Sequence, residues 1–377
     1  MSLFWFIFPF VVVFFAYFGD ERVTRNKVAS LWSRVFLLLT LSVVLATCGG
    51  VYTDHETYSD FYYYFSKTKG VEFTTFRDFF LIKTEGLVSP VENGFAFLLW
   101  SIGQLNFSHV GFFFIIGGIT NYFIIKAFYR FKYPTIIFLL YIISVQYQQE
   151  FNLVRQMMAV SMIFYALRYV EENNWKKYLL YAIVAFTIHQ SSIVSILFLP
   201  FCFTRERERI WKVARIILGV VFTFSFLVAI RFIPFNLTFI TVYFDLYAGY
   251  VTNEDTIGVG DQSMNLLYNL IVILTIIQYR KGDQKYLYII FMIIGCIISN
   301  IAVQTPNLNR IALYFSIAYL PLVPCLLKDG YLFKKQNLSE MTYTLFIIYN
   351  CAVIAKFILT GNNIIGSKME SIFNFFI

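Results

Sequence analysis

The sequence predicts an all-α, polytopic integral membrane protein, and its composition and apolar runs carry that prediction. Hydrophobic residues make up 59% of the 377 residues and charged residues only 14%, whereas soluble domains carry roughly 45–50% apolar and about 25% charged residues. Apolar runs that approach the ~20 residues of a membrane-spanning helix recur along the whole chain. A disordered chain, a secreted disulfide scaffold and a cytosolic enzyme are therefore excluded.

The net charge of +8 does not indicate nucleic-acid binding, because the basic residues stand between apolar runs. Six basic clusters hold 20 of the 30 lysines and arginines. Their members are Arg22, Arg25, Lys27; Lys126, Arg130, Lys132; Arg168, Lys176, Lys177; Arg205, Arg207, Arg209, Lys212, Arg215; Arg280, Lys281, Lys285; and Lys328, Lys334, Lys335. Basic residues in short loops mark the cytoplasmic side of a membrane, so the stretches between clusters are expected to loop outward.

The expected helices follow this alternation of basic clusters and apolar runs. They are Leu3–Phe18, Leu31–Cys48, the short Phe95–Leu105, Val110–Ile125, two arms of about 15–18 residues around a polar apex at 146–152, Ile210–Ile230, Leu266–Tyr279, Tyr286–Val303, Leu308–Leu327 and Met341–Thr360. The first is expected to be a membrane helix and not a cleaved signal peptide, because its positive charges follow the apolar run instead of preceding it. Its N-terminus is expected outside.

One further stretch, between Lys177 and Arg205, is too short for two full crossings. Only 27 residues separate these two basic ends, and two crossings need ~40. We favour a hairpin of two half-helices, Tyr178–Ile188 and Ser192–Phe203, over a single long tilted helix. In total the sequence predicts about twelve crossings or half-crossings, in one membrane domain of residues 1–377 with outer segments at 49–93 and 231–264 and both termini outside.

Three ionisable side chains lie within apolar spans, where a charge is costly and is a functional candidate by default. They are Arg155, His189 and Arg310, and the expected topology places all three at the outer end of the bundle. Five cysteines lie inside or at the ends of apolar runs without any C-x-x-C pair, so they are interpreted as small core- or lipid-facing residues. No metal site is expected, because no second His or Cys lies at ligand spacing to His189.

Arg155 shares a predicted helix face with three other small or polar residues. Asn152, Gln156 and Ala159 stand at i−3, i+1 and i+4 from it, and Asn152 is a candidate N-cap for the inward-running helix. Arg310 also begins an inward-running helix, and both arginines stand in an N-L-x-R tetrad. A cation in the first turn of a helix is unfavourable, because it lies at the positive end of the helix dipole. An anion bound there by the guanidinium and the free backbone N–H groups makes the position favourable.

Two such arginines together suit a diphosphate. The alternative interpretation is that each arginine snorkels to lipid headgroups or pairs with a carboxylate such as Glu150. His189 lies at a polar break between apolar arms, where a neutral imidazole can be a general base or can simply end a half-helix.

Aromatic and acidic residues interleave in the first outer segment. They are Tyr52, Tyr58, Tyr62, Tyr63, Tyr64 and Phe65, with Asp54, Asp60 and Asp78. Aromatic faces beside carboxylates are typical of sugar recognition, and the alternative is an interfacial aromatic belt.

Several of these residues resemble the EpsG/Wzy-type bacterial polysaccharide polymerases. The N-x-x-R-Q-x-x-A motif of Asn152, Arg155, Gln156 and Ala159 is followed, after a basic loop, by the His-x-Ser-Ser motif at His189. The late Arg310, Tyr314 and Phe315 fit the same pattern, as do the early Tyr58, Asp60 and Tyr64 with Glu92 before the next helix. The resemblance covers roughly residues 30 to 330.

The resemblance implies a GT-C-like, metal-independent glycosyltransferase without a cofactor. Such enzymes lie in the bacterial inner membrane with the active site toward the periplasm. They join oligosaccharide repeat units carried on undecaprenyl diphosphate by transferring the growing chain to a new lipid-linked unit. A chain-length regulator and membrane lipid are the further candidate partners.

The residue roles that fit this chemistry form a hypothesis. Arg155 and Arg310 hold the diphosphate, and His189 deprotonates the acceptor hydroxyl. Substrate-orienting candidates are Asn152, Gln156 and Tyr314, while Asp60 and Glu92 are candidates for sugar contacts or as an alternative base. Three rival activities remain: an O-antigen ligase, a lipid-linked oligosaccharide flippase or other transporter, and a membrane acyltransferase.

Overall fold

The structure is a computed structural model that describes residues 3–48, 54–67, 83–84, 91–203, 207–229, 268–276, 286–303 and 308–328. The chain forms two compact units, one of residues 1–203 with 357–377 and one of residues 204–356. The expected span Met341–Thr360, the outer segment 231–264 and parts of 49–93 and of Leu266–Tyr279 lie outside the described residues. The single membrane domain stays a prediction.

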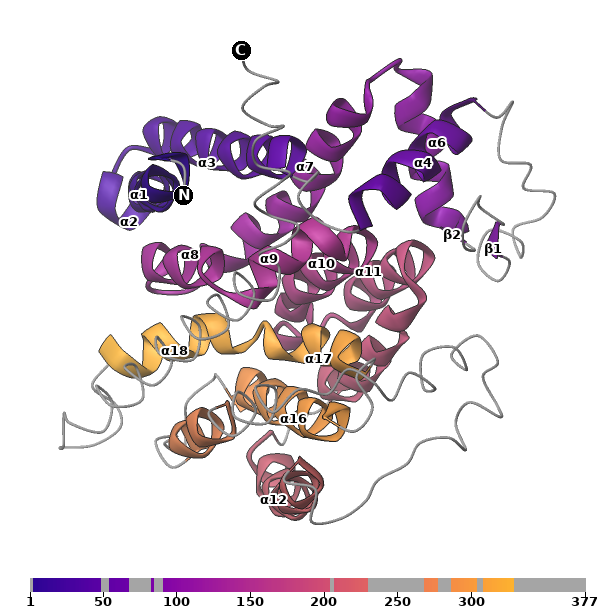
Figure 1. Cartoon of the computed structure of the whole chain (residues 1–377). Helices are drawn as coiled ribbons and strands as arrows, with labels where there is room; N and C mark the ends of the chain where they lie inside the picture. Colours follow the sequence, from indigo (N-terminus) through magenta and orange to yellow (C-terminus); the bar gives the residue numbers. More distant parts are fainter. Residues whose placement is uncertain are drawn as a thin grey trace. The chain divides into compact units, whose positions relative to one another are not determined.

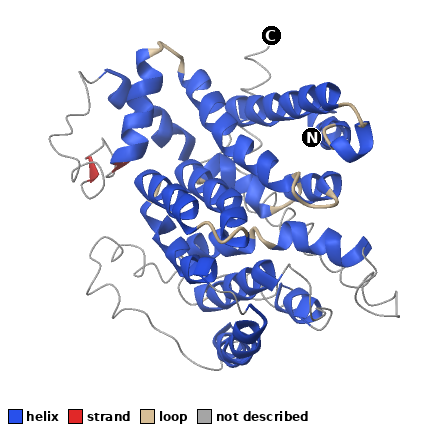
Figure 2. Cartoon of the chain, turned by 180° about the vertical axis from the view of Figure 1, so that it is seen from behind, coloured by secondary structure: helices blue, strands red, loops and turns tan. Residues whose placement is uncertain are grey.

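The first unit is built almost entirely from helices (Figures 1 and 2). They are α1 (Leu3–Phe18), α2 (Glu21–Thr24), α3 (Lys27–Cys48), α4 (Asp54–Lys67), α6 (Asn93–Gln104), α7 (His109–Phe128), α8 (Pro134–Ile142), α9 (Val145–Asn152), α10 (Val154–Glu171), α11 (Trp175–Ile188) and the 3₁₀ helix η2 (Gln190–Phe203). The two-residue strands β1 (Lys83–Thr84) and β2 (Val91–Glu92) pair antiparallel, with Lys83 opposite Glu92.

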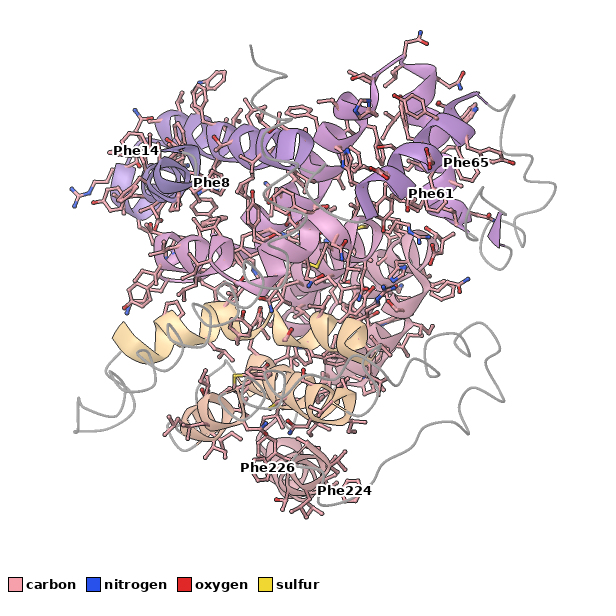
Figure 3. All side chains as sticks on the ribbon, viewed as in Figure 1. Phe8, Phe14, Phe61, Phe65, Phe224 and Phe226 are labelled. Atoms are coloured by element: carbon pink, nitrogen blue, oxygen red, sulfur yellow. The ribbon has the colours of Figure 1, made fainter. Side chains whose placement is uncertain are left out.

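The apolar composition produces helices with one face inside and one face outside. In α1, Phe8, Val12 and Ala16 are buried at a spacing of four residues, whereas Phe14 is 56% exposed. Phe8 and Phe14 lie on different sides of this helix in Figure 3. The buried stripe packs against α3 and α8. Large exposed apolar side chains of this kind are what a lipid-facing surface requires.

Two described helices are long and apolar enough to cross a membrane: Lys27–Thr47 and His109–Phe128. They pack against each other closely, because Gly117 of α7 lies where a Cβ atom would come within 2.7 Å of the Leu45 side chain of α3. Small residues allow this approach between membrane helices. Shorter apolar helices accompany them, and the count of about twelve crossings stays a prediction.

Helix α10 lies in the core of this unit. Fifteen of its eighteen residues are buried, and it packs against α7, α9, α11 and η2. Figure 1 shows it between α9 and α11. Because partner helices cover most of its surface, the polar residues in the middle of α10 face protein.

The predicted hairpin between Lys177 and Arg205 is confirmed. Helix α11 ends at Ile188, and η2 then returns along it. Trp175 at the start of α11 and Phe203 at the end of η2 have ring centroids 5.9 Å apart, and the Tyr178 hydroxyl donates to the Ser195 carbonyl at 2.8 Å. His189 therefore lies at the closed end of the hairpin.

Two expectations about element length were wrong, those for the arm before the polar apex and for the span Leu308–Leu327, and two further stretches are helical where the sequence analysis assigned no helix. The first outer segment contains the 14-residue helix α4. The arm before the polar apex forms only the nine residues of α8, because Pro134 sets its start, and the apex itself is helical as α9. The expected span Leu308–Leu327 divides into two helices, with a turn at residues 317–318.

The second unit is described by helix α12 (Arg207–Ala229), the helical residues 268–276, α16 (Tyr286–Ala302), α17 (Leu308–Ser316) and α18 (Tyr319–Lys328). Three buried polar side chains join its first three helices. The Asn300 amide donates to Ser225 Oγ at 3.1 Å and to Asn269 Oδ1 at 2.8 Å, and the Asn269 amide donates back to Asn300 at 2.6 Å. Buried amides in an apolar bundle are satisfied by each other in this way.

Candidate active site

A buried carboxylate, Glu92, connects the two strongest sequence candidates of the first unit. Its Oε2 accepts a hydrogen bond from Arg155 Nη1 at 2.6 Å, and its Oε1 lies 3.0 Å from His189 Nδ1. Oε1 also accepts from the backbone N–H of Gln190 at 3.2 Å. The side chains of Glu92, Arg155 and His189 are 6%, 16% and 19% exposed. We call these three residues the Glu92 cluster.

Three short-range structural features place the cluster. Glu92 is the N-cap residue of α6 but makes no side-chain hydrogen bond to that helix, so its carboxylate is available for Arg155 and His189. Arg155 lies in the first turn of α10. His189 ends α11 in an extended conformation, with φ −153° and ψ 115°, which turns the chain into η2.

The close approach of α6 to α11 depends on a glycine. A Cβ atom on Gly94 would come within 2.6 Å of the Thr187 carbonyl oxygen and nearer still to the Thr187 side chain. Real Cβ contacts are not this short, so any larger residue forces the two helices apart. Gly94 therefore allows Glu92 to reach His189.

Aromatic rings surround the Arg155 guanidinium. Its Cζ lies 5.8, 5.7 and 5.9 Å from the ring centroids of Tyr58, Phe61 and Phe95. Tyr58 and Phe61 come from α4 and Phe95 comes from α6, and Phe61 is marked in Figure 3. Rings at this distance attract a cation, more so where water is excluded.

The Glu92 carboxyl stays ionised in this setting. Burial alone would raise its pKa, but the hydrogen bond with His189 and the charge of Arg155 outweigh burial and lower the pKa to about 2. A carboxylate only accepts hydrogen bonds, so the His189 nitrogen that faces it, Nδ1, carries a proton. Proton acceptance therefore falls to Nε2 of His189, as in other carboxylate–histidine pairs.

Arg155 retains donors beyond its bond to Glu92. A guanidinium has five N–H groups; Arg155 uses donors for Glu92 and Tyr58, and its buried Nε has no hydrogen-bond partner among the described residues. An anion that reached this side chain would meet a pre-positioned fork of donors. The alternative partner considered from the sequence, Glu150, is engaged elsewhere: it accepts hydrogen bonds from Tyr141 and from the Asn121 amide, the latter at 3.0 Å.

The remaining candidates of the first unit lie around the cluster in different ways. Gln156 is buried next to Arg155 on α10. Asn152 is the last residue of α9, and Leu153 is the N-cap of α10, so the expectation that Asn152 caps this helix was wrong. Asp60 is exposed on α4, about 200° around the helix from the buried Tyr58. The structure thus brings Glu92, Arg155 and His189 together and leaves Asp60 facing away.

Arg310 and Tyr314 belong to the second unit. Arg310 is the third residue of α17 and is half-buried, and Tyr314, one turn later, is 2% exposed. The position of Arg310 at the start of a helix agrees with the sequence expectation. Sequence reasoning did not select Gly94, Phe61 or Phe95. A glycine two residues after an acidic residue, at the start of an apolar helix, is a pattern that could have indicated Gly94.

These features define a helical membrane protein with an ionised carboxylate, a histidine and an arginine at the end of a helical hairpin. Comparison with known families shows that the chain belongs to the EpsG family, whose profile matches residues 31–376. This is the Wzy-type polysaccharide polymerase family, so the resemblance found in the motifs is confirmed. Comparisons with curated proteins and with solved structures gave no match.

Proposed function

We propose that this protein joins undecaprenyl-diphosphate-linked oligosaccharide units into a polysaccharide on the periplasmic face of the bacterial inner membrane. Membership of the EpsG family supports a membrane-associated, glycosyltransferase-like polymerase. The Glu92 cluster is the main structural support for this reaction, because one carboxylate contacts both a histidine and an arginine. Glycosyl transfer from a diphosphate needs a base for the acceptor and a cation for the leaving group.

In the proposed reaction His189 is the general base. The acceptor hydroxyl of the incoming lipid-linked unit gives its proton to Nε2 of His189 as its oxygen forms a bond to the anomeric carbon of the growing chain. Glu92 accepts the Nδ1 hydrogen bond and stabilises the imidazolium that forms. Positioned proton transfer of this kind typically contributes about 10²–10⁴-fold in rate.

Arg155 stabilises the other side of the same step. The bond between the anomeric carbon and the diphosphate oxygen breaks, and negative charge develops on the leaving undecaprenyl diphosphate. The donors of Arg155 that bind neither Glu92 nor Tyr58 meet this charge. The aromatic rings of Tyr58, Phe61 and Phe95 keep the guanidinium in a water-poor setting, where such an interaction is strongest.

Other residues enter the proposal with supporting roles. Gln156, beside Arg155 on α10, and Asn152, at the end of α9, orient phosphate or sugar. Arg310 and Tyr314 enter from the sequence alone, as further contacts to the diphosphate and sugar. Asp60 is exposed and is retained only as a sugar contact.

The test is in vitro polymerisation with purified protein and a defined lipid-linked repeat unit, read as a ladder on a gel. We expect a ladder from the wild type and its loss in His189→Ala and Arg155→Ala. The matched controls are His109→Ala, whose Nδ1 lies 3.1 Å from the Tyr63 hydroxyl, and Arg130→Ala, which removes the ion pair with Glu171; both should keep the ladder.

Other outcomes assign the rival activities. Transfer of the glycan to a lipid A acceptor without chain growth identifies a ligase. Movement of the lipid-linked unit across vesicles without a new glycosidic bond identifies a transporter. A full ladder from expression-matched His189→Ala and Arg155→Ala proteins contradicts the proposed mechanism.

A further inference from the structure

A second cluster of basic and aromatic side chains lies at the other end of α10. The Arg168 Cζ lies 4.2 and 4.3 Å from the ring centroids of Tyr165 and Tyr169. Tyr169 stacks on Tyr181 of α11 with ring centroids 5.6 Å apart, and Lys177 Nζ lies 5.5 Å from the Tyr169 centroid. Arg168 follows Arg155 by thirteen residues, which is about 20 Å along a helix.

Helix α7 adds a further lysine and tyrosine to this cluster. Lys126 Nζ lies 5.6 Å from the ring centroid of Tyr122. The neighbouring Phe123 contacts both Tyr165 and Tyr181, with ring centroids 5.5 and 6.1 Å apart. Three helices thus contribute to one group, which we call the Arg168 cluster: Tyr122, Lys126, Tyr165, Arg168, Tyr169, Lys177 and Tyr181.

The charge of the Arg168 cluster is positive and partly open to its surroundings. Lys126 and Lys177 are exposed and Arg168 is half-buried. Glu172, one turn after Arg168, offsets one charge, while the neighbouring Glu171 is engaged by Arg130. The buried Nε of Arg168 has no hydrogen-bond partner within the described residues. Arg168 Nη2 donates to the Tyr169 hydroxyl, and the cluster as a whole retains a net positive charge.

An exposed apolar stripe continues from the cluster along α11. Lys177, Leu180, Tyr181 and Val184 share one helix face at i, i+3, i+4 and i+7. Leu180 is 60% exposed and Val184 is 40% exposed. A single helix face thus presents a cation at one end and apolar side chains beyond it, which matches a molecule with an anionic head and an acyl tail.

We propose that the Arg168 cluster binds the phosphate headgroup of an anionic phospholipid, with the acyl chains along the α11 stripe. The flanking basic clusters, which include Arg130, Lys132 and Lys176, mark this end as cytoplasmic by the positive-inside rule. The cytoplasmic leaflet carries anionic lipids, and basic pockets between membrane helices bind their headgroups. A soluble phosphate ester would leave the apolar stripe unused. This site is independent of the proposed polymerase activity.

The test compares purified protein in nanodiscs of phosphatidylcholine alone and of phosphatidylcholine with phosphatidylglycerol. Native mass spectrometry counts retained lipids, and thermal unfolding measures the stabilisation. We expect wild-type protein to retain phosphatidylglycerol and to unfold at higher temperature when it is present. Lys177→Gln and Arg168→Gln should each weaken retention about fivefold, because each removes a cation that contacts the bound headgroup and such a charge contributes about 1 kcal/mol.

The matched control is Lys132→Gln, an exposed lysine at the same end that packs on Tyr133, and it should retain the lipid as the wild type does. If Arg168→Gln fails to fold, the double variant Lys126→Gln/Lys177→Gln changes only exposed side chains and should weaken retention more than Lys177→Gln alone does. Glycerol phosphate in solution should give no shift. Equal retention by wild type and cluster variants, equal stabilisation by phosphatidylcholine, or an equal shift with glycerol phosphate would each overturn the proposal.

Discussion

Glu92 and His189 are 97 residues apart in the chain, and the carboxylate of one lies 3.0 Å from Nδ1 of the other. This contact joins the start of α6 to the closed end of the α11–η2 hairpin. The second oxygen of Glu92 binds Arg155 at 2.6 Å. A single buried carboxylate thus fixes the orientation of both side chains to which the proposed reaction assigns chemistry.

The first prediction concerns the charge of Glu92. In Glu92→Gln the amide oxygen still accepts from Nδ1, but the negative charge that stabilises an imidazolium and balances Arg155 is lost. We expect the polymerisation rate to fall by about 10²–10⁴-fold, measured as initial rates of ladder growth with protein matched by expression. Glu92→Asp keeps the charge but is one methylene shorter, so it should lose less than Glu92→Gln.

The matched control for this prediction is Glu171→Gln, which removes a different carboxylate that pairs with an arginine, Arg130. It should leave the rate within a few-fold of the wild type, because partly exposed ion pairs contribute little. A Glu92→Gln protein with wild-type initial rates would contradict the role assigned to this carboxylate.

A second prediction follows from the low pKa of Glu92. The pKa of Glu92 in the folded protein is about 2, below the ordinary value of 4.5. The ionised carboxylate therefore stabilises the fold at every pH above about 4.5. This contribution is lost as the pH falls through the interval from about 4.5 to about 2, where the unfolded state binds the proton first. The sign is therefore stabilisation at neutral pH and its loss in acid.

The measurement compares denaturant unfolding of wild type and Glu92→Gln in micelles from pH 7 to pH 3. The difference in unfolding free energy should shrink as the pH falls from about 4.5 to 3. A difference that grows in acid, or that stays unchanged down to pH 3, would show that the folded pKa is not lowered.

The sequence predicted the hairpin and the three charged positions because these depend on local patterns. The 27 residues between Lys177 and Arg205 are too few for two crossings, and Arg155 and His189 stand out against apolar neighbours. Helix α1 has the bounds expected from its apolar run, Leu3–Phe18. These inferences need only length, periodicity and composition.

The partners of Glu92 and the start of α10 could not be predicted from the sequence, because they depend on contacts between distant parts of the chain or on neighbouring helices. Glu92 stands in a polar segment that carries other acidic residues, and nothing local indicates that it pairs with side chains 63 and 97 residues away. Asn152 has the residue type of an N-cap, but α9 continues through it and leaves Leu153 in that position. The predicted face of four residues therefore fails at Asn152, while Arg155, Gln156 and Ala159 remain on one helix.

A third prediction concerns Glu150, another buried carboxyl group of this unit. It is 1% exposed and accepts hydrogen bonds from Tyr141 and Asn121, which ties α9 to α8 and α7. Glu150→Ala removes the acceptor for two buried donors and should lower the unfolding free energy by about 1–3 kcal/mol. Glu150→Gln keeps an acceptor oxygen and should lose clearly less.

Unfolding in mixed micelles, with the polymerisation assay in parallel, distinguishes this role from that of Glu92. We expect both Glu150 variants to polymerise at rates much closer to the wild type than Glu92→Gln does, once the amount of folded protein is matched. A rate loss as large as that of Glu92→Gln, without loss of stability, would place Glu150 in the chemistry instead.

The fourth prediction tests the spacing between α6 and α11. Gly94→Ala places a Cβ atom within 2.6 Å of the Thr187 carbonyl oxygen, and backbone atoms at this distance must move apart. Overpacking of this kind typically costs about 1–3 kcal/mol, and it should also lengthen the contact between Glu92 and His189. The expected result is lower thermal stability together with a rate loss in the direction of Glu92→Gln.

Gly118→Ala is the matched control, because it makes the same substitution within a helix of the same unit. Among the described residues, the only atom that its Cβ would meet is Ser42 Oγ at 3.7 Å, an ordinary contact, and alanine favours a helix more than glycine does. Stability and rate should therefore equal or exceed those of the wild type. If Gly94→Ala behaves like Gly118→Ala in both measurements, the close approach of α6 and α11 is not what positions Glu92 against His189.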